Sequence, residues 1–126
     1  MPHDPRPKFL NLLAIRQPIG AVTSILHRLT GVLLFVLLPV AAWLLELSLR
    51  DPAGYARAGA WLESGVGQGL LLVLAWIVFH HLFAGIRFLL LDLDWGLQRI
   101  AARRMAWIAT LAAPLAALLF VGGVLL

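Results

Sequence analysis

A long apolar run in the second half of the chain ends in His80-His81-Leu82-Phe83-Ala84-Gly85-Ile86-Arg87-Phe88-Leu89-Leu90-Leu91-Asp92. The run begins near Val66, and almost every residue in it is Leu, Val, Ile, Ala or Trp. A helix of roughly 26 residues is long enough to cross a membrane with some tilt. The sequence therefore predicts a membrane-spanning helix that carries two histidines and an arginine in its inner half.

These polar residues are unusual because an arginine at membrane depth costs on the order of 2.5–3.5 kcal/mol, and such residues commonly mark functional sites. In a helix, His81, Gly85, Phe88 and Asp92 are spaced i, i+4, i+7 and i+11, which places them on one face. That face combines an imidazole, a residue without a side chain, an aromatic ring and an acid at the water boundary. The pattern favours a site where a flat cofactor lies against Gly85 and is held by His81.

The composition agrees with a membrane protein. Of the 126 residues, 62% are hydrophobic and only 13% are charged, whereas soluble domains have a more even balance. The absence of cysteine excludes disulfides and thiolate metal sites. The net charge of +4 comes from basic residues beside apolar spans, so membrane topology explains it better than nucleic-acid binding. The first residues lack a signal-peptide pattern, so we expect the first span to direct insertion.

The hydropathy pattern predicts an all-α membrane protein with a single domain over residues 1–126. The expected segments are a cytoplasmic or interfacial stretch over 1–22 and three transmembrane helices over 23–49, 66–91 and 105–126. We expect a loop at 53–65, because Arg50-Asp51-Pro52 ends the first helix, and a second polar connection at 92–104.

Basic residues predict the orientation, because loops rich in Lys and Arg stay in the cytoplasm. The segment before the first span and the connection at 92–104 contain most of them, namely Arg6, Lys8, Arg16, Arg28, Arg99, Arg103 and Arg104. The connection at 50–65 has only Arg50 and Arg57. We therefore expect a cytoplasmic N-terminus and an external C-terminus, and the polar groups of the first two helices should gather in the inner leaflet.

The residue types indicate electron-transfer chemistry. A histidine such as His81 is a good ligand for haem iron, and a second histidine on the opposite face of the haem suits electron transfer. His80 points about 100° away on the same helix, and we expect His27 near the membrane surface, so the second ligand should come from another subunit. His27 and Arg28 are candidates for the anionic haem propionates. Ser24 and Arg28 are candidates for a quinone carbonyl, with Asp92 as a proton route.

Two motifs carry a family resemblance. Arg6-Pro7, Ile15-Arg16-Gln17-Pro18-Ile19 and Ser24-Ile25-Leu26-His27-Arg28-Leu29-Thr30-Gly31 resemble the start of the cytochrome b556 membrane-anchor subunits of succinate dehydrogenase. The segment His81-x-x-x-Gly85-Ile86-Arg87-x-x-x-x-Asp92 resembles the second-helix signature of that family. The three-span layout and the length agree, so the resemblance covers nearly the whole chain. One position departs from it, because Phe88 stands where the family commonly has histidine.

The resemblance implies a membrane subunit of complex II in the bacterial cytoplasmic (inner) membrane, inactive alone. His81 would be an axial ligand of haem b, shared with a second anchor subunit in a heterodimeric anchor. Ser24 and Arg28 would line the ubiquinone site, and His27 would lie near a propionate. The flavoprotein and iron-sulfur subunits would dock on the cytoplasmic face, so electrons from succinate would reach ubiquinone.

Other interpretations stay open at the level of sequence. A fumarate reductase anchor that oxidises menaquinol would use the same residues in the reverse direction. A haemless structural anchor or half of a small transporter belongs to a different class. His80 is expected to be structural or lipid-facing. The alternative is that His80 binds the haem iron in place of His81. Arg87 and Asp92 are candidates for an ion pair with each other.

Overall fold

The computed structural model describes the backbone of residues 15–125 and the side chains of residues 15–124. It contains four helices, α1 (Ile19–Arg50), α2 (Pro52–Glu63), α3 (Gly65–Asp92) and α4 (Arg99–Leu125), and no strand within the described residues. Three of them, α1, α3 and α4, are long and apolar enough to cross a membrane. The predicted all-α class with three transmembrane helices is therefore confirmed.

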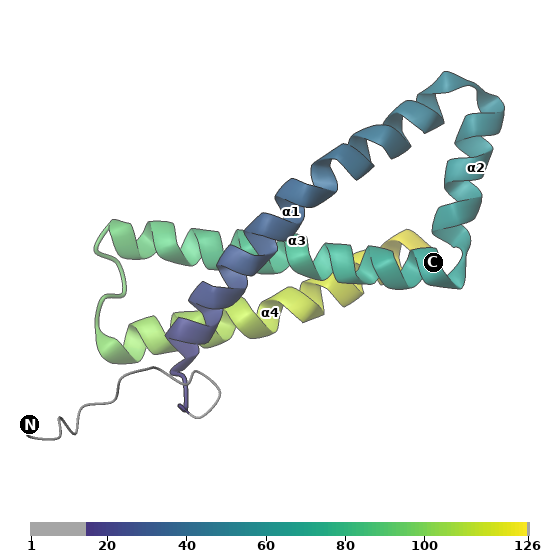
Figure 1. Cartoon of the computed structure of the whole chain (residues 1–126). Helices are drawn as coiled ribbons and strands as arrows, with labels where there is room; N and C mark the ends of the chain where they lie inside the picture. The colour runs from purple at the N-terminus through teal and green to yellow at the C-terminus, as the bar shows by residue number, and fades with distance from the viewer. Residues whose placement is uncertain (1–14, 126) are drawn as a thin grey trace, which may run out of the picture.

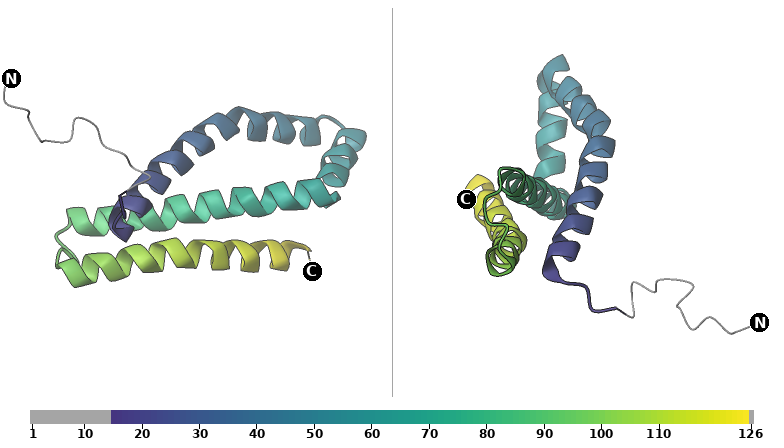
Figure 2. Two further views of the ribbon diagram at one scale, coloured as in Figure 1. Left: turned by 60° about the horizontal axis from the view of Figure 1, so that its bottom comes forward. Right: turned by 90° about the vertical axis from the view of Figure 1, so that its left-hand side faces the viewer.

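The helices are arranged as a tight hairpin with a third helix laid across it. α3 and α4 run side by side in opposite directions, and α1 crosses α3 obliquely before diverging from it (Figure 1). The start of α1, the end of α3 and the start of α4 lie at the same end of the molecule, as a second view also shows (Figure 2). This arrangement gathers the polar residues of α1 and α3 at one end, as the sequence predicted.

The α3–α4 hairpin is held together by small residues. Four of the five buried positions on α4 are Ala106, Ala109, Ala113 and Ala117, which recur every three or four residues and so form one stripe. Small side chains let two helices approach closely in a membrane, where dispersion contacts rather than the hydrophobic effect favour association. At the outer end, Ala117 and Val121 pack with Ala75 and its larger neighbours on α3. The hairpin is thus the closely packed part of the chain.

The expected loop over 53–65 is wrong, because the chain forms α2 there. Asp51 caps this helix by accepting a hydrogen bond from the backbone N–H of Gly54 at 2.6 Å, and Pro52 occupies its first turn. The Asp-Pro pair that ends α1 is therefore also a helix start signal, since Pro is favoured at the first helical position. Ser64 then caps α3 through the N–H of Gly67 at 3.0 Å.

The observed helix ends differ from the expected ones. α1 begins at Ile19 rather than at residue 23, and α4 begins at Arg99 rather than at residue 105, whereas α3 differs by one residue at each end. The reason is that the hydrophobic run marks only the part of a helix within the hydrocarbon. Arg99, Arg103 and Arg104 are good helix formers and continue α4 beyond that layer. Of the interfacial stretch expected at 1–22, residues 1–14 lie outside the described part.

The outer part of α1 has few contacts with the rest of the chain. Its most apolar 18-residue window has no buried residue, whereas about a fifth of the corresponding windows in α3 and α4 is buried (22% each). Phe35 and Leu49 are each 75% exposed. Within this chain, α1 is therefore anchored mainly through its first half, where it crosses α3.

Candidate functional site

His81 lies where α1 crosses α3. Gly31 on α1 makes the close approach possible, because a Cβ atom at this position would lie 3.0 Å from Cε1 of the His81 ring. This distance is shorter than an ordinary van der Waals contact, so a larger residue would displace the imidazole. The ring is only partly buried, which leaves part of it accessible to a ligand.

The hydrogen bonds of His81 define its tautomer. Its Nδ1 lies 3.2 Å from the backbone carbonyl oxygen of His27 and 3.3 Å from Oγ1 of Thr30. The Thr30 hydroxyl donates to backbone carbonyl groups of its own helix, at 2.8 Å for Leu26 and 3.0 Å for His27. Because a carbonyl oxygen only accepts, Nδ1 of His81 carries the hydrogen. Nε2 therefore keeps its lone pair, which is the state that a metal-binding histidine requires.

His27 stacks on His81, with ring centroids 4.2 Å apart and planes inclined by 9°. Gly85 gives His27 its space, because a Cβ atom at Gly85 would lie 3.4 Å from Nε2 of His27. The Phe88 ring lies 5.2 Å from His27 on the next turn of α3. The predicted face of α3 thus packs against α1. We did not expect His27 to contact His81, and the 4.2 Å between their ring centroids means that the two rings lie at similar depths.

His80 occupies a different environment from its neighbour. It is completely buried, with Trp76 at a centroid distance of 5.7 Å, so the expected alternative of a lipid-facing ring is wrong. Both ring nitrogens are covered and have no hydrogen-bond partner in the described part of the chain. Protein atoms thus surround the nitrogens and leave no space beside them for an iron atom.

The other candidate residues lie around this histidine pair. Ser24 and Arg28 are one turn apart on the flank of α1 beside His27, with Ser24 half-buried and Arg28 exposed. Asp92 is exposed at the last position of α3. No ion pair joins Asp92 to Arg87 among the described residues, and Arg87 is instead buried, with 7% of its surface exposed.

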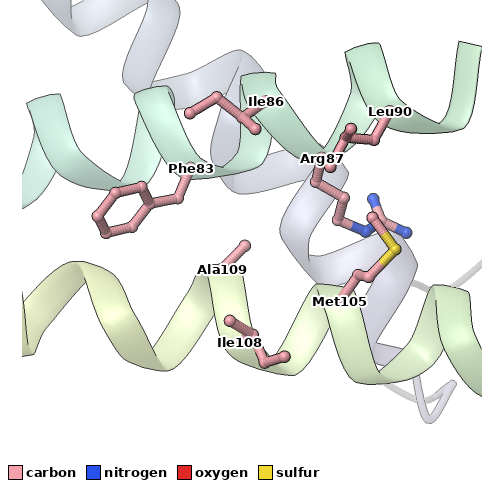
Figure 3. Close-up of a pocket in the computed structure, with 7 residues that line it drawn as sticks. All are labelled: Phe83, Ile86, Arg87, Leu90, Met105, Ile108 and Ala109. Carbon is pink, nitrogen blue, oxygen red and sulfur yellow. The ribbon is translucent and has the colours of Figure 1, made fainter. Parts of the chain in front are cut away.

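A small pocket opens between α3 and α4 near Arg87. Its volume is about 220 Å³, and Arg87 is its charged residue, because the rest of its lining is apolar. Figure 3 shows Phe83, Ile86 and Leu90 on α3 opposite residues of α4, with the Arg87 guanidinium beside Met105 at one end. No group of three or more His, Asp or Glu residues that could hold a metal ion exists in the described part of the chain.

Sequence reasoning missed the role of Thr30. This residue is completely buried and contacts the ring that we predicted to be functional. A signal existed, because Thr30, His27 and Thr23 recur at three- and four-residue spacing and so share a face of α1. Thr23 is likewise buried and lies 2.9 Å from the Thr110 hydroxyl of α4. Only the helix crossing identifies which threonine faces which partner.

Comparisons with known proteins agree with this architecture. The family model of the succinate dehydrogenase/fumarate reductase transmembrane subunit matches residues 2–121. The chain is 33% identical to the succinate dehydrogenase cytochrome b556 subunit of Paracoccus denitrificans over 93 residues, or 74% of this chain and 72% of that protein. It is 31% identical to the subunit of the same name from Rickettsia felis over 105 residues, or 83% of this chain and 82% of that protein.

The relative of the same name from Coxiella burnetii is 33% identical over 92 residues, or 70% of this chain and 71% of that protein. Three helices that can span a membrane and relatives of this kind identify a multi-pass protein of a bacterial inner membrane. The match over nearly the whole length shows that the chain belongs to the family of succinate dehydrogenase/fumarate reductase transmembrane subunits.

Proposed function

We propose that this chain is the haem- and quinone-binding membrane anchor of a succinate dehydrogenase. The relatives described above are named as cytochrome b556 subunits of that enzyme, which supports this direction over fumarate reduction. In this proposal the chain pairs with a second anchor subunit, and flavoprotein and iron-sulfur subunits dock on its cytoplasmic face. It has no activity alone, because succinate oxidation takes place on the flavoprotein.

The observation that carries the proposal is the hydrogen bonding of the His81 ring. Its Nδ1–H is directed to the His27 carbonyl oxygen, so Nε2 is available to bind the iron of haem b. The ring is also partly accessible, in contrast to His80, whose nitrogens are fully covered. The residues therefore fit a haem held by His81. When bound, haem b stores and releases single electrons within the membrane.

A second axial ligand from another subunit is consistent with the stacked rings. Two histidines that bind opposite faces of a haem point toward each other through the iron. His27 and His81 instead lie face to face and nearly parallel, so His27 is not oriented to bind across from His81. We assign His27 a contact to a haem propionate, because its ring lies beside His81, the proposed iron ligand. An imidazole can also donate a hydrogen bond to a carboxylate.

Ser24 and Arg28 would hold ubiquinone. A quinone carbonyl needs hydrogen-bond donors, and its oxygen gains negative charge as electrons arrive from the iron-sulfur subunit. The Ser24 hydroxyl donates one hydrogen bond, and the Arg28 guanidinium stabilises the developing charge. Reduction also consumes two protons, and Asp92 is an exposed carboxylate at the same end of the molecule. This position requires the N-terminus to be cytoplasmic, as the basic residues predict.

The exposed outer part of α1 supports a second anchor subunit. Large apolar side chains cover its surface without packing against α3 or α4, for example at Phe35, Leu45 and Leu49. A two-subunit anchor would bury part of this surface and would bring the second haem ligand toward His81. The outer end of α1 diverges from the α3–α4 hairpin, and α2 connects it back to the start of α3 (Figure 1).

A spectrum of the purified complex tests the proposal. A reduced-minus-oxidised difference spectrum should contain a b-type haem band, and the complex should reduce ubiquinone with electrons from succinate. A complex that contains this chain and reduces ubiquinone without any b-type band would contradict the haem assignment. A chain that purifies without flavoprotein and iron-sulfur subunits would contradict the anchor function itself.

A further inference from the structure

A second polar feature lies at the same end of the molecule but is not used by the proposed haem and quinone sites. It is a pocket of about 380 Å³ between the first turn of α1, the end of α3 and the first two turns of α4. Three arginines line it, Arg87, Arg99 and Arg103, and its lining contains no acidic residue. The pocket therefore concentrates positive charge at the edge of the membrane-spanning region.

Arg87 is the most informative of these arginines. Only 7% of its surface is exposed, and its Nε is buried without a hydrogen-bond partner in the described part of the chain. Its guanidinium reaches α1, because a Cβ atom at Gly20 would lie 3.5 Å from Nη2. The Phe88 ring, 5.1 Å away, provides a weak cation–π contact but no counter-charge. A buried cation without an acidic partner favours binding of an anion.

Two helix starts add positive potential to the pocket. The N–H groups at the beginning of a helix lack partners and carry a partial positive charge, which attracts anions. α1 has no side-chain cap among the described residues, and Ile19 and Gly20 of its first turn line the pocket. α4 begins with Arg99 and has no acidic residue in its first turn. The partial positive charges at both helix starts and the charges of the three arginines thus all favour an anion in the pocket.

We propose that this pocket binds the phosphate group of an anionic phospholipid in the inner leaflet. The neighbouring surface can hold the acyl chains, because a groove of about 630 Å³ shares Arg99, Arg103 and Trp107 with the pocket and also includes Ile100 and Arg104. Arginine side chains expose aliphatic stems beside their charged ends, and tryptophan is typical of the membrane–water interface. An arginine-lined pocket next to a groove of two apolar side chains and three arginine stems fits a molecule with a charged head and apolar chains.

The test uses the whole purified complex and native mass spectrometry. Dioleoylphosphatidylglycerol, which is anionic, and dioleoylphosphatidylcholine, which has no net charge, are titrated separately. Each arginine near a lipid phosphate contributes about fivefold to binding, so Arg99→Gln/Arg103→Gln should weaken the tightest phosphatidylglycerol site about 25-fold. The double variant should retain one phosphatidylglycerol fewer than the wild type, with no change for phosphatidylcholine. Arg99 and Arg103 are both exposed, so the substitutions leave the helix packing intact.

Arg57→Gln is the control, because it removes an exposed arginine from α2, the helix at the opposite end of the molecule (Figure 1). It should leave phosphatidylglycerol binding unchanged. The anion could be the phosphate group of a lipid or free inorganic phosphate. Inorganic phosphate at millimolar concentration distinguishes these two sources, and we expect that it does not displace the lipid. Displacement by phosphate would overturn the lipid assignment in favour of a free-anion site. Equal phosphatidylglycerol retention by the wild type and the double variant would overturn the site, as expected if acidic residues of a partner subunit fill the pocket.

Discussion

The imidazole rings of His27 and His81 lie face to face, 4.2 Å apart, at the crossing of α1 and α3. This contact links the two sequence motifs, which are separated by about half of the chain. It is possible because Gly31 and Gly85 leave space on the opposite helix, each next to one of the rings. The backbone carbonyl group of His27 also holds Nδ1 of His81, so the same residue supports the ring through both its side chain and its main chain.

Gly31→Ala should weaken haem binding. The new Cβ atom would lie 3.0 Å from the His81 ring, so the ring or α1 must move, and overpacking of this kind costs about 1–3 kcal/mol. We expect a lower ratio of haem to flavin in the purified complex, measured by the b-type band. Gly69→Ala in α3 is the control, because nothing lies within 4 Å of its Cβ position. Equal loss of haem in both variants would show that close packing at Gly31 is unimportant.

Thr30→Val should change the haem potential while most of the haem remains bound. Valine has nearly the shape of threonine but lacks the oxygen that lies 3.3 Å from Nδ1 of His81, and the His27 carbonyl group still accepts from that nitrogen. A weaker hydrogen bond makes the imidazole a poorer electron donor to iron, so the midpoint potential should rise. A redox titration of the b-type band measures this shift.

Thr23→Val is the matched control for that titration. Thr23 is a buried threonine on the same helix, but its hydroxyl faces Thr110 on α4 rather than His81. It should leave the midpoint potential unchanged. A potential that is the same in Thr30→Val as in the wild type would mean that the Thr30 hydroxyl does not influence His81.

Arg28→Ala should impair quinone reduction but not succinate oxidation. A hydrogen bond to a charged group contributes about 1.5–3 kcal/mol, so kcat/KM for ubiquinone should fall roughly tenfold or more. Succinate oxidation with a soluble dye as acceptor should stay at the wild-type level, because it needs only the flavoprotein and iron-sulfur subunits. Ser24→Ala should act in the same direction with a smaller effect, since its hydroxyl is neutral. Arg57→Ala in α2, the helix at the far end of the molecule (Figure 1), is the control for charge removal.

An equal fall in dye and quinone activity in Arg28→Ala would indicate that Arg28 supports assembly rather than the quinone. Unchanged activity with both acceptors would remove Arg28 from the quinone site.

The sequence was sufficient for the helical class, the three spans and the shared face of His81, Gly85 and Phe88. These features depend on hydropathy and on helical periodicity, which are local properties. It was insufficient for α2, because the Asp51-Pro52 pair acts both as a stop and as a start. It was also insufficient for the contact between His27 and His81, because the close approach of α1 and α3 depends on Gly31 and Gly85. Contacts between distant residues of this kind are not encoded in either helix alone.

The same limit applies to the difference between His80 and His81. Adjacent residues on a helix point about 100° apart, so periodicity alone indicates that they face different neighbours. It does not indicate which ring is completely buried and which one meets α1. Burial of both nitrogens of His80 and the free Nε2 of His81 distinguish them only once the hairpin is assembled.

The most direct test of the account is the b-type haem band in two complexes that differ only at adjacent positions, His81→Ala and His80→Ala. Both complexes are compared at equal flavin content, so that assembly is controlled. We predict that His81→Ala abolishes or strongly weakens the band and that His80→Ala retains a band at the wild-type wavelength. A normal band in His81→Ala together with its loss in His80→Ala would contradict the account, because the enclosed histidine would then be the ligand.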